Sequence, residues 1–141
     1  MEIKLKKLQD NAVMPTKAHA TDAGCDLTAA NFDTDLDGNF VYGTGIAVEI
    51  PAGFVGLVFP RSSVAGVGLQ LTNCVGVIDC GYRGEVKMKF RPHGRGVCNP
   101  YKVGDRIGQL IIMPYPEVTF TEVEQLSDSE RGEGGYGSSG R

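Results

Sequence analysis

Short apolar runs recur along the chain and are separated by turn residues, above all glycine and proline. In most runs apolar and polar positions alternate, which is the period of a β-strand with one buried face. The run 54–59 is almost wholly apolar, as in a strand buried on both faces, and Pro60 ends it. An Asp-Gly step between two extended patterns predicts a hairpin turn at 35–39. The pattern predicts strands at 1–8, with Ile3, Leu5 and Leu8 turned inward, and at 46–50, 54–59, 75–78, 85–90, 107–113 and 118–123.

A single all-β domain is the architecture that this spacing favours. Strands about every ten residues, with turn signals between them, are typical of a jelly-roll or sandwich. The chain has 141 residues with 20 glycines and 7 prolines, which is long enough for one core and too short for two. Only 62–69 is compatible with a helix, and its glycines keep that helix short. We therefore expect a β jelly-roll or distorted β-barrel over residues 1–126.

The last segment, 127–141, differs from the rest in composition. It is polar, contains five glycines and has no aliphatic residue, so it cannot order itself by burying apolar surface. A frayed terminus is the usual meaning of such a segment. Here, however, an arginine, an aromatic ring and paired serines are distributed among the glycines, as a flap over a phosphate-bearing aromatic ligand requires. We predict a flexible tail that closes over an active site.

Charge and cysteine content narrow the function classes. The net charge of −3 disfavours binding to a nucleic acid polymer, which usually needs a basic face, but it permits a small anionic ligand. The four cysteines include no Cys-x-x-Cys pair, and neither His19 nor His93 has neighbouring ligands at zinc-site spacing. We therefore expect reduced, packed thiols. No run approaches the roughly 20 apolar residues of a membrane span, and the N-terminus lacks a signal-peptide core, so we expect a cytoplasmic protein that binds no membrane.

Two of five notable segments combine charged or hydroxyl side chains with glycine. In 22–27, Asp22 and Asp26 stand four residues apart, either as a simple turn or as oxygen ligands for a hydrated magnesium ion. In 60–66, Arg61, Ser62 and Ser63 follow a strand, either as a capped turn or as a phosphate site.

A third segment, 73–84, places Asp79 at the end of an apolar strand and Tyr82 three residues later. Asp79 either starts a hairpin turn, with Tyr82 covering the core, or acts as a general base that deprotonates a water. Asn73 offers both a donor and an acceptor to the polar edge of a base.

A fourth segment, 104–110, contains Arg106 and Gln109 within a predicted strand. Their spacing puts them on opposite faces, so we expect them not to serve the same ligand. Arg106 is then structural, paired with Asp105 or another carboxylate, and Gln109 is free to orient a water or a phosphate.

Together with the tail, 131–140, these segments resemble the five motifs of the trimeric dUTPases in order and spacing, over nearly the whole chain from Asp22 to Gly140. The third segment and the tail are the most specific. Tyr136 stands where the family often has Phe, Ser139 where it often has Thr, and Gly108 where it often has Ala. The first two keep the ring and the hydroxyl, and the third removes only a methyl group, so the resemblance stands.

The resemblance implies a jelly-roll homotrimer that hydrolyses dUTP to dUMP and pyrophosphate, which limits uracil in DNA and supplies dUMP for thymidylate synthesis. Each active site would take the third motif from one subunit, the first, second and fourth from another, and the tail from the third. Asp26 would hold Mg²⁺ through a water. The implied catalytic residues are Asp79, Gln109 and Arg131, and the implied substrate-binding residues are Arg61, Ser62, Ser63, Asn73, Gly76, Val77, Tyr82, Tyr136, Gly137, Ser138 and Ser139.

Two alternatives stay open. A dCTP deaminase of the same superfamily would share the jelly-roll and the triphosphate site, but it would lack this tail and would need a glutamate at the base site. Glu85 is the only nearby candidate, and it lies beyond the predicted turn. A non-catalytic nucleotide sensor or regulator is the other alternative, against which the presence of Asp79, Gln109 and Arg131 argues.

Overall fold

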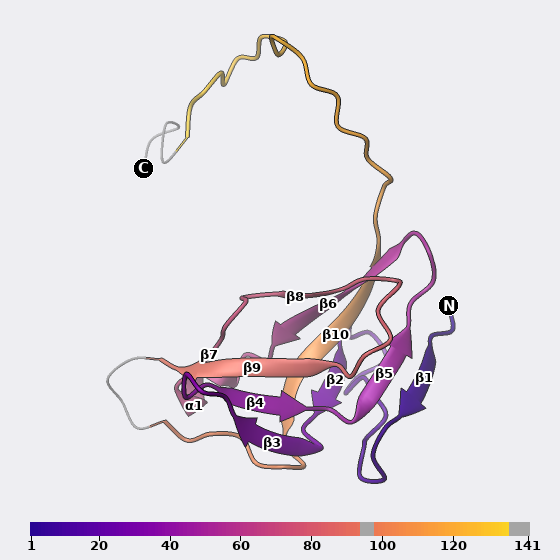
Figure 1. Cartoon of the computed structure of the whole chain (residues 1–141), viewed down its shortest axis with the longest axis vertical. Helices are drawn as coiled ribbons and strands as arrows, with labels where there is room; N and C mark the ends of the chain where they lie inside the picture. The colour runs from indigo at the N-terminus through magenta and orange to yellow at the C-terminus, as the bar shows by residue number, and fades with distance from the viewer. Residues whose placement is uncertain (94–97, 136–141) are drawn as a thin grey trace.

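Antiparallel strands in three sheets form the body of the molecule (Figure 1). The computed structural model describes residues 1–93 and 98–135. Within that part of the chain the single helix is α1, Val64–Val67, and no helix is long and apolar enough to cross a membrane. The strands are β1 Lys4–Lys7, β2 Cys25–Thr28, β3 Asn31–Thr34, β4 Phe40–Gly43, β5 Ile46–Glu49, β6 Phe54–Pro60, β7 Leu69–Leu71, β8 Gly76–Ile78, β9 Lys87–Pro92 and β10 Arg106–Pro114.

Neighbouring strands in the sheets are mostly not consecutive in sequence. One four-stranded sheet has the order β2-β10-β6-β8, the other has β3-β4-β9-β7, and β1 pairs with β5. Every pair is antiparallel. Connections that pass between two antiparallel sheets in this way are typical of a jelly-roll, so the all-β prediction is confirmed.

Buried side chains from both four-stranded sheets form one apolar cluster. Its centre is aromatic, with ring centroids 5.9 Å apart for Tyr42 and Phe90 and 6.0 Å apart for Tyr42 and Tyr101, in edge-on geometry. The Tyr42 hydroxyl donates to the Tyr101 carbonyl oxygen at 3.0 Å. Burial raises the pKa of Tyr42 to about 12. This aromatic contact joins β4, β9 and the segment that leads into β10.

The hairpin turn predicted at 35–39 is confirmed between β3 and β4. Gly38 adopts a φ of 78°, and its amide donates to the Asp35 carbonyl oxygen at 3.0 Å. The Asp35 carboxylate lies 2.8 Å from the Lys89 ammonium. Hydrogen bonds from Lys89 and Asn39 hold the pKa of Asp35 well below its usual range.

Most predicted strands are present, with shifted ends and less burial than expected in two places. Strand β6 has alternate residues only half buried, so it is not buried fully on both faces. Leu8 lies beyond the end of β1 and is exposed, although its backbone amide donates to Gly45 at 2.7 Å. The short helix predicted within 62–69 is confirmed as α1.

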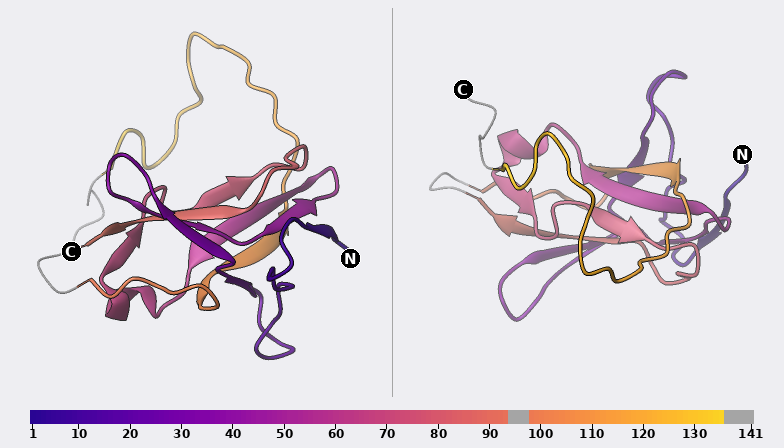
Figure 2. Two further views of the ribbon diagram at one scale, coloured as in Figure 1. Left: turned by 60° about the horizontal axis from the view of Figure 1, so that its bottom comes forward. Right: turned by 90° about the horizontal axis from the view of Figure 1, so that it is seen from above.

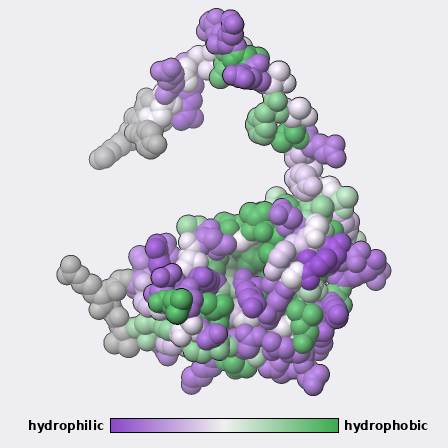
Figure 3. All heavy atoms as spheres, viewed as in Figure 1, coloured by the Kyte–Doolittle hydropathy of each residue, from purple (hydrophilic) through white to green (hydrophobic). Residues whose placement is uncertain are grey.

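The strand predicted at 118–123 is wrong for this chain. Residues 115–126, here called the arm, leave the body after β10 and form no strand (Figure 2). Every residue of the arm is exposed, and Phe120 is 94% exposed. Figure 3 shows apolar side chains on this projecting segment, away from the body. An alternating pattern makes a strand only where a sheet edge is available to pair with it, and among residues 1–93 and 98–135 the arm pairs with no strand.

Candidate active site

The first, second and fourth motifs meet because β2, β10 and β6 are neighbours. Gln109 on β10 is paired across the sheet with Asp26 on β2 and with Phe59 on β6. Two residues after Phe59, Arg61 leaves the end of β6. Three segments that are distant in sequence therefore deliver their polar side chains to one end of the sheet.

Asp26 is the centre of this group. It is only 6% exposed, and a buried carboxylate requires charged or hydrogen-bonding partners. Its Oδ1 lies 3.2 Å from Arg61 Nε and 3.3 Å from Gln109 Nε2. Its Oδ2 accepts a hydrogen bond from Arg106 Nη1 at 2.9 Å. One carboxylate thus orients two guanidinium groups and one amide.

The expectation that Arg106 and Gln109 face opposite sides is wrong. The β2–β10 pairing shifts register between Arg106 and Gly108, which is a β-bulge. A bulge adds one residue to one strand and so re-aims the side chains on either side of it. Arg106 and Gln109 therefore both reach Asp26. The prediction that Arg106 pairs with a carboxylate is confirmed, and Gln109 also donates to Asp26 through Nε2, which leaves its amide oxygen available to another partner.

Gly24 contributes space to this group. A Cβ at Gly24 would come 3.1 Å from the Gln109 Cβ, so a side chain there would press on the Gln109 side chain. The hydroxyls of the second motif lie at the surface, because Ser62 and Ser63 are exposed. Ser63 is the N-cap residue of α1, but its side chain makes no capping bond.

The donor set at Asp26 fits an indirectly held magnesium ion. An ionised carboxylate offers about four lone-pair sites, and Arg61, Arg106 and Gln109 occupy three of them. The Asp26 carboxylate can therefore accept one further hydrogen bond, for example from a metal-bound water, but it cannot bind a metal ion through both of its oxygens. Among residues 1–93 and 98–135, no group of three His, Cys, Asp or Glu side chains could hold a metal. A magnesium ion would have to arrive with other oxygen ligands, as it does with a triphosphate.

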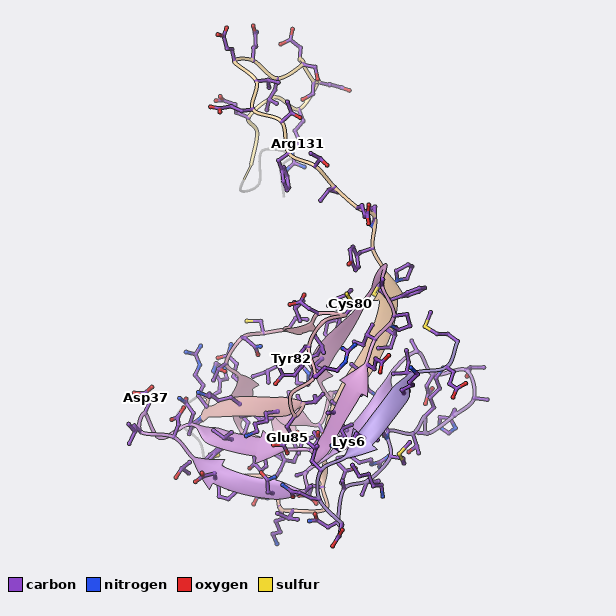
Figure 4. All side chains as sticks on the ribbon, turned by 45° about the vertical axis from the view of Figure 1, so that its right-hand side comes forward. Lys6, Asp37, Cys80, Tyr82, Glu85 and Arg131 are labelled. Carbon is purple, nitrogen blue, oxygen red and sulfur yellow. The ribbon has the colours of Figure 1, made fainter. Side chains whose placement is uncertain are left out.

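The third motif forms a pocket of about 260 Å³ beside β8. Asp79 follows β8 directly and is exposed. Tyr82 is 43% exposed and its hydroxyl donates to the Glu85 carbonyl oxygen at 3.0 Å. Figure 4 shows Tyr82 and Glu85 on the body of the molecule, with Cys80 on the same loop between β8 and β9. The pocket is lined by Val77, Ile78, Asp79, Tyr82, Glu85 and Lys87.

The turn before β8 positions Asn73. Its side chain lies beside Gly76, because a Cβ at Gly76 would be 3.6 Å from Asn73 Nδ2. Cys74 in the same turn has a φ of 59° and is exposed. The four cysteines are free thiols, but the expectation that they are packed is wrong for Cys74.

Within one chain these groups do not come together. Ile78 pairs with Gly56 and Gln109 pairs with Phe59, so Asp79 and Gln109 lie about four residues, or roughly 13 Å, apart along β6. Arg131 lies far from the body (Figure 4), and its Nε donates to the Gly134 carbonyl oxygen at 2.8 Å. The remaining predicted binding residues, Tyr136, Gly137, Ser138 and Ser139, lie outside the described residues.

Two polar residues of the pocket, Glu85 and Lys87, are not among the predicted binding residues. The sequence offers Glu85 only as a candidate deaminase base, and it gives no indication of a role for Lys87. Both belong to an alternating run in which polar positions usually face solvent. Residue pattern alone does not distinguish a solvent-facing position from a pocket-facing one, and no other signal marked them.

Comparison with known proteins adds to this geometry. The dUTPase family model matches residues 10–140. A deoxyuridine 5'-triphosphate nucleotidohydrolase of Nocardia farcinica is 44% identical over 140 residues, covering 98% of this chain and 85% of that protein. The corresponding protein of Gloeobacter violaceus is 42% identical, covering 99% of this chain and 97% of that protein.

Solved structures that are similar to this chain are also dUTPases. A mutant dUTPase of a Staphylococcus bacteriophage, 80alpha, with dUpNHpp has a TM-score of 0.81 at 32% identity, with 99% of each chain covered. A mutant dUTPase from phage phi11 of S. aureus, described for the coordination of a structural Mg(II) ion, has a TM-score of 0.74 at 26% identity, with 89% of this chain and 98% of that chain covered. The match runs through all five motifs and nearly the whole chain, and the chain belongs to the dUTPase family.

Proposed function

We propose that this protein is a dUTP diphosphatase, which hydrolyses dUTP to dUMP and pyrophosphate by attack of water on the α-phosphorus. The observation that carries the proposal is the family match over residues 10–140, which spans all five motifs. The reaction removes dUTP before polymerases can use it and supplies dUMP for thymidylate synthesis. A cytoplasmic location is part of the proposal, since nucleotide pools are its substrate source.

Asp79 is the general base in this proposal. It is exposed at the pocket, where its carboxylate can take a proton from the attacking water. Gln109 helps to position that water and an α-phosphate oxygen, and its contact with Asp26 keeps its amide oriented. Ser62 donates to the oxygen that bridges the α- and β-phosphates, where negative charge builds as pyrophosphate leaves.

The triphosphate is held by cations and by the tail. Arg61, oriented by Asp26, and the Ser63 hydroxyl lie at the phosphate end of the site. Arg131 acts as an arginine finger on the γ-phosphate, with Ser138 and Ser139 beside it. A magnesium ion bound to the triphosphate, and to Asp26 through a water, would neutralise phosphate charge.

The third motif selects the base and the sugar. Asn73, with backbone groups at Gly76 and Val77, pairs with the polar edge of uracil and leaves no room for the methyl group of thymine. Cytosine reverses the donor and acceptor pattern, which leaves buried polar groups unpaired. Tyr82 lies under the deoxyribose and excludes a 2′-hydroxyl, while Tyr136 with Gly137 covers the uracil when the tail closes.

A homotrimer with shared sites is part of the same proposal. Two observations support it: the separation of Asp79 from Gln109 in one chain, and an arm with exposed Val118, Phe120 and Val123. Large apolar side chains gathered on one exposed segment are often covered by a partner. In a closed trimer, different subunits would supply the third motif, the first, second and fourth motifs, and the tail of each site.

The environment of Glu85 argues against a dCTP deaminase. Its carboxylate accepts a hydrogen bond from the Gly45 amide at 2.8 Å and lies 3.3 Å from Lys87 Nζ. A carboxylate held in this way is engaged in structure and poorly placed to shuttle protons. A non-catalytic regulator would not need Asp79 exposed beside the pocket.

One assay separates the three functions. The purified protein is offered dUTP and dCTP with magnesium, and pyrophosphate, ammonia and nucleotide binding are measured. Pyrophosphate from dUTP without ammonia is the expected result. Ammonia from dCTP would establish the deaminase, and tight dUTP binding without turnover would establish a binding-only role.

A further inference from the structure

We propose that Glu85 is a positioning residue for Tyr82, whose carboxylate anchors the backbone that holds the Tyr82 ring and thereby sets the preference for deoxyribose over ribose. This inference rests on the proposed function, in which the Tyr82 ring lies under the sugar.

The Tyr82 ring is not held by the core. Tyr82 is 43% exposed and lies in the loop between β8 and β9. Its amide donates to the Asp79 carbonyl oxygen and its hydroxyl to the Glu85 carbonyl oxygen, each at 3.0 Å. The ring lies against Gly84, because a Cβ there would collide with it. The place of the ring therefore depends on the peptide at Glu85.

The Glu85 side chain fastens that peptide to the corner between β4 and β5. Its Oε1 accepts hydrogen bonds from the Gly45 amide at 2.8 Å and from Asn31 Nδ2 at 3.3 Å. The following residue is tied to the same corner, since the Val86 amide donates to the Ile46 carbonyl oxygen at 2.9 Å. A Cβ at Gly43 would collide with the carboxylate and with Asn31, so the corner is shaped to receive them.

The hydrogen bonds to Glu85 Oε1 hold the Glu85 side chain in place, and the ion pair with Lys87 contributes little. Lys87 Nζ lies 3.3 Å from Oε2, but the Lys87 side chain is 57% exposed, and exposed pairs contribute little. The Glu85 side chain is 15% exposed, so removing it leaves the Gly45 amide and Asn31 without their acceptor. Glu85→Gln keeps an acceptor oxygen and loses the ion pair, whereas Glu85→Ala loses both.

The measured quantity is the ratio of kcat/KM for dUTP to kcat/KM for UTP. A ring held in one position excludes the 2′-hydroxyl by contact, and a loosely held ring admits it. Partial unfolding lowers both rates equally and cancels in the ratio, so a merely structural role for Glu85 would not change it. We expect the ratio to fall at least about tenfold in Glu85→Ala and to stay within about twofold of wild type in Glu85→Gln.

Two further variants sharpen the test. Tyr82→Phe removes the hydroxyl that reaches Glu85, so it should lower the ratio, and the double variant with Glu85→Ala should lower it no further than the larger single effect. Glu49→Ala, at an exposed glutamate that pairs with Lys4, is the matched control and should leave the ratio unchanged. An unchanged ratio in Glu85→Ala, or an equal fall in Glu85→Gln, overturns the proposal.

A second readout needs no turnover. Protein labelled with 3-fluorotyrosine gives a ¹⁹F resonance for Tyr82, which is assigned by its loss in Tyr82→Phe. In Glu85→Ala this resonance should move toward the position of free fluorotyrosine, and in Glu85→Gln and Glu49→Ala it should not. If wild type fails to hydrolyse dUTP, the proposed function falls while this resonance still decides whether Glu85 holds Tyr82. An unmoved resonance in Glu85→Ala overturns the positioning role.

Discussion

At the scale of single residues, Gly108 shows how tightly β10 is packed beside the site. A Cβ on this residue would collide with the Met88 sulfur and lie 2.9 Å from the Phe59 carbonyl oxygen. The methionine can move, but the backbone oxygen of a paired strand cannot move freely. A methyl group at residue 108 is therefore not harmless in this chain.

Gly108→Ala should therefore lower the free energy of unfolding by about 1–3 kcal/mol, as overpacking usually does. Thermal and urea unfolding measure the change. Gly66→Ala is the matched control, because a Cβ at Gly66 meets nothing within 4 Å. Equal stability of the two variants would show that Met88 and β6 accommodate the methyl group.

Asp79→Asn tests the proposed general base. Asp79 is exposed, so the change should preserve the fold and nucleotide binding while kcat falls by roughly 10²–10⁴. Circular dichroism, nucleotide titration and pyrophosphate release measure the three quantities. Turnover close to wild type would remove Asp79 from this role.

The residues of the Asp26 group were predicted from sequence, but their mutual contacts were not. Arg106 and Gln109 meet the same carboxylate because of a bulge, and a bulge depends on how two distant strands pair. Local pattern assigns a strand residue to a face only while the pairing is regular. The sequence therefore predicts which polar residues belong to the site, but it does not predict that Arg106 and Gln109 both contact Asp26.

At the scale of elements, the tail gives a direct test. Truncation after Ser129 should leave a stable trimer with severely reduced turnover, because the body ends its last strand at Pro114. In the full chain, amide exchange of residues 131–140 should slow when a non-hydrolysable dUTP analogue is added with magnesium. Unchanged exchange at saturating ligand would mean that the tail is only a frayed end.

The arm and β2 explain which elements escape prediction. Residues 118–123 have the alternating pattern of a strand, but that pattern reports a tendency to pair and not the presence of a partner. Conversely, β2 contains Asp26 and follows Gly24, so its sequence resembles a turn. It becomes a strand because β10 pairs with it. Local sequence predicted the longest strands, β6 and β10, whereas β2 depends on its pairing with β10.

At the scale of the whole molecule, two inactive variants should rescue each other if sites are shared. Asp79→Asn and Arg131→Ala chains are co-refolded in equal amounts so that they assort randomly into closed trimers. A working site needs its Asp79 from an Arg131→Ala chain, with a probability of about one half. It needs its Arg131 from an Asp79→Asn chain, also with a probability of about one half. Activity should therefore recover to roughly a quarter of wild type, provided that sites act independently.

Native mass spectrometry must first confirm mixed trimers, since unmixed trimers would stay inactive in any case. Confirmed mixed trimers without recovered activity would contradict a site that takes Asp79 and Arg131 from different subunits. Recovery to about a quarter would also set aside any arrangement in which one chain supplies both residues.

The covalent connection between the arm and Arg131 sets the local concentration of the Arg131 guanidinium at an active site. With the arm bound to a partner, residues 127–130 connect it to Arg131, and a flexible chain of four residues has a root-mean-square span of about 11 Å. Within the proposed trimer, such a tether gives the guanidinium a local concentration in the millimolar range. A free peptide of the same sequence would have to be supplied at roughly that concentration to replace the tail of a truncated enzyme. Covalent connection, rather than a strong intrinsic affinity of the tail for the body, would then keep Arg131 available while still letting the product leave.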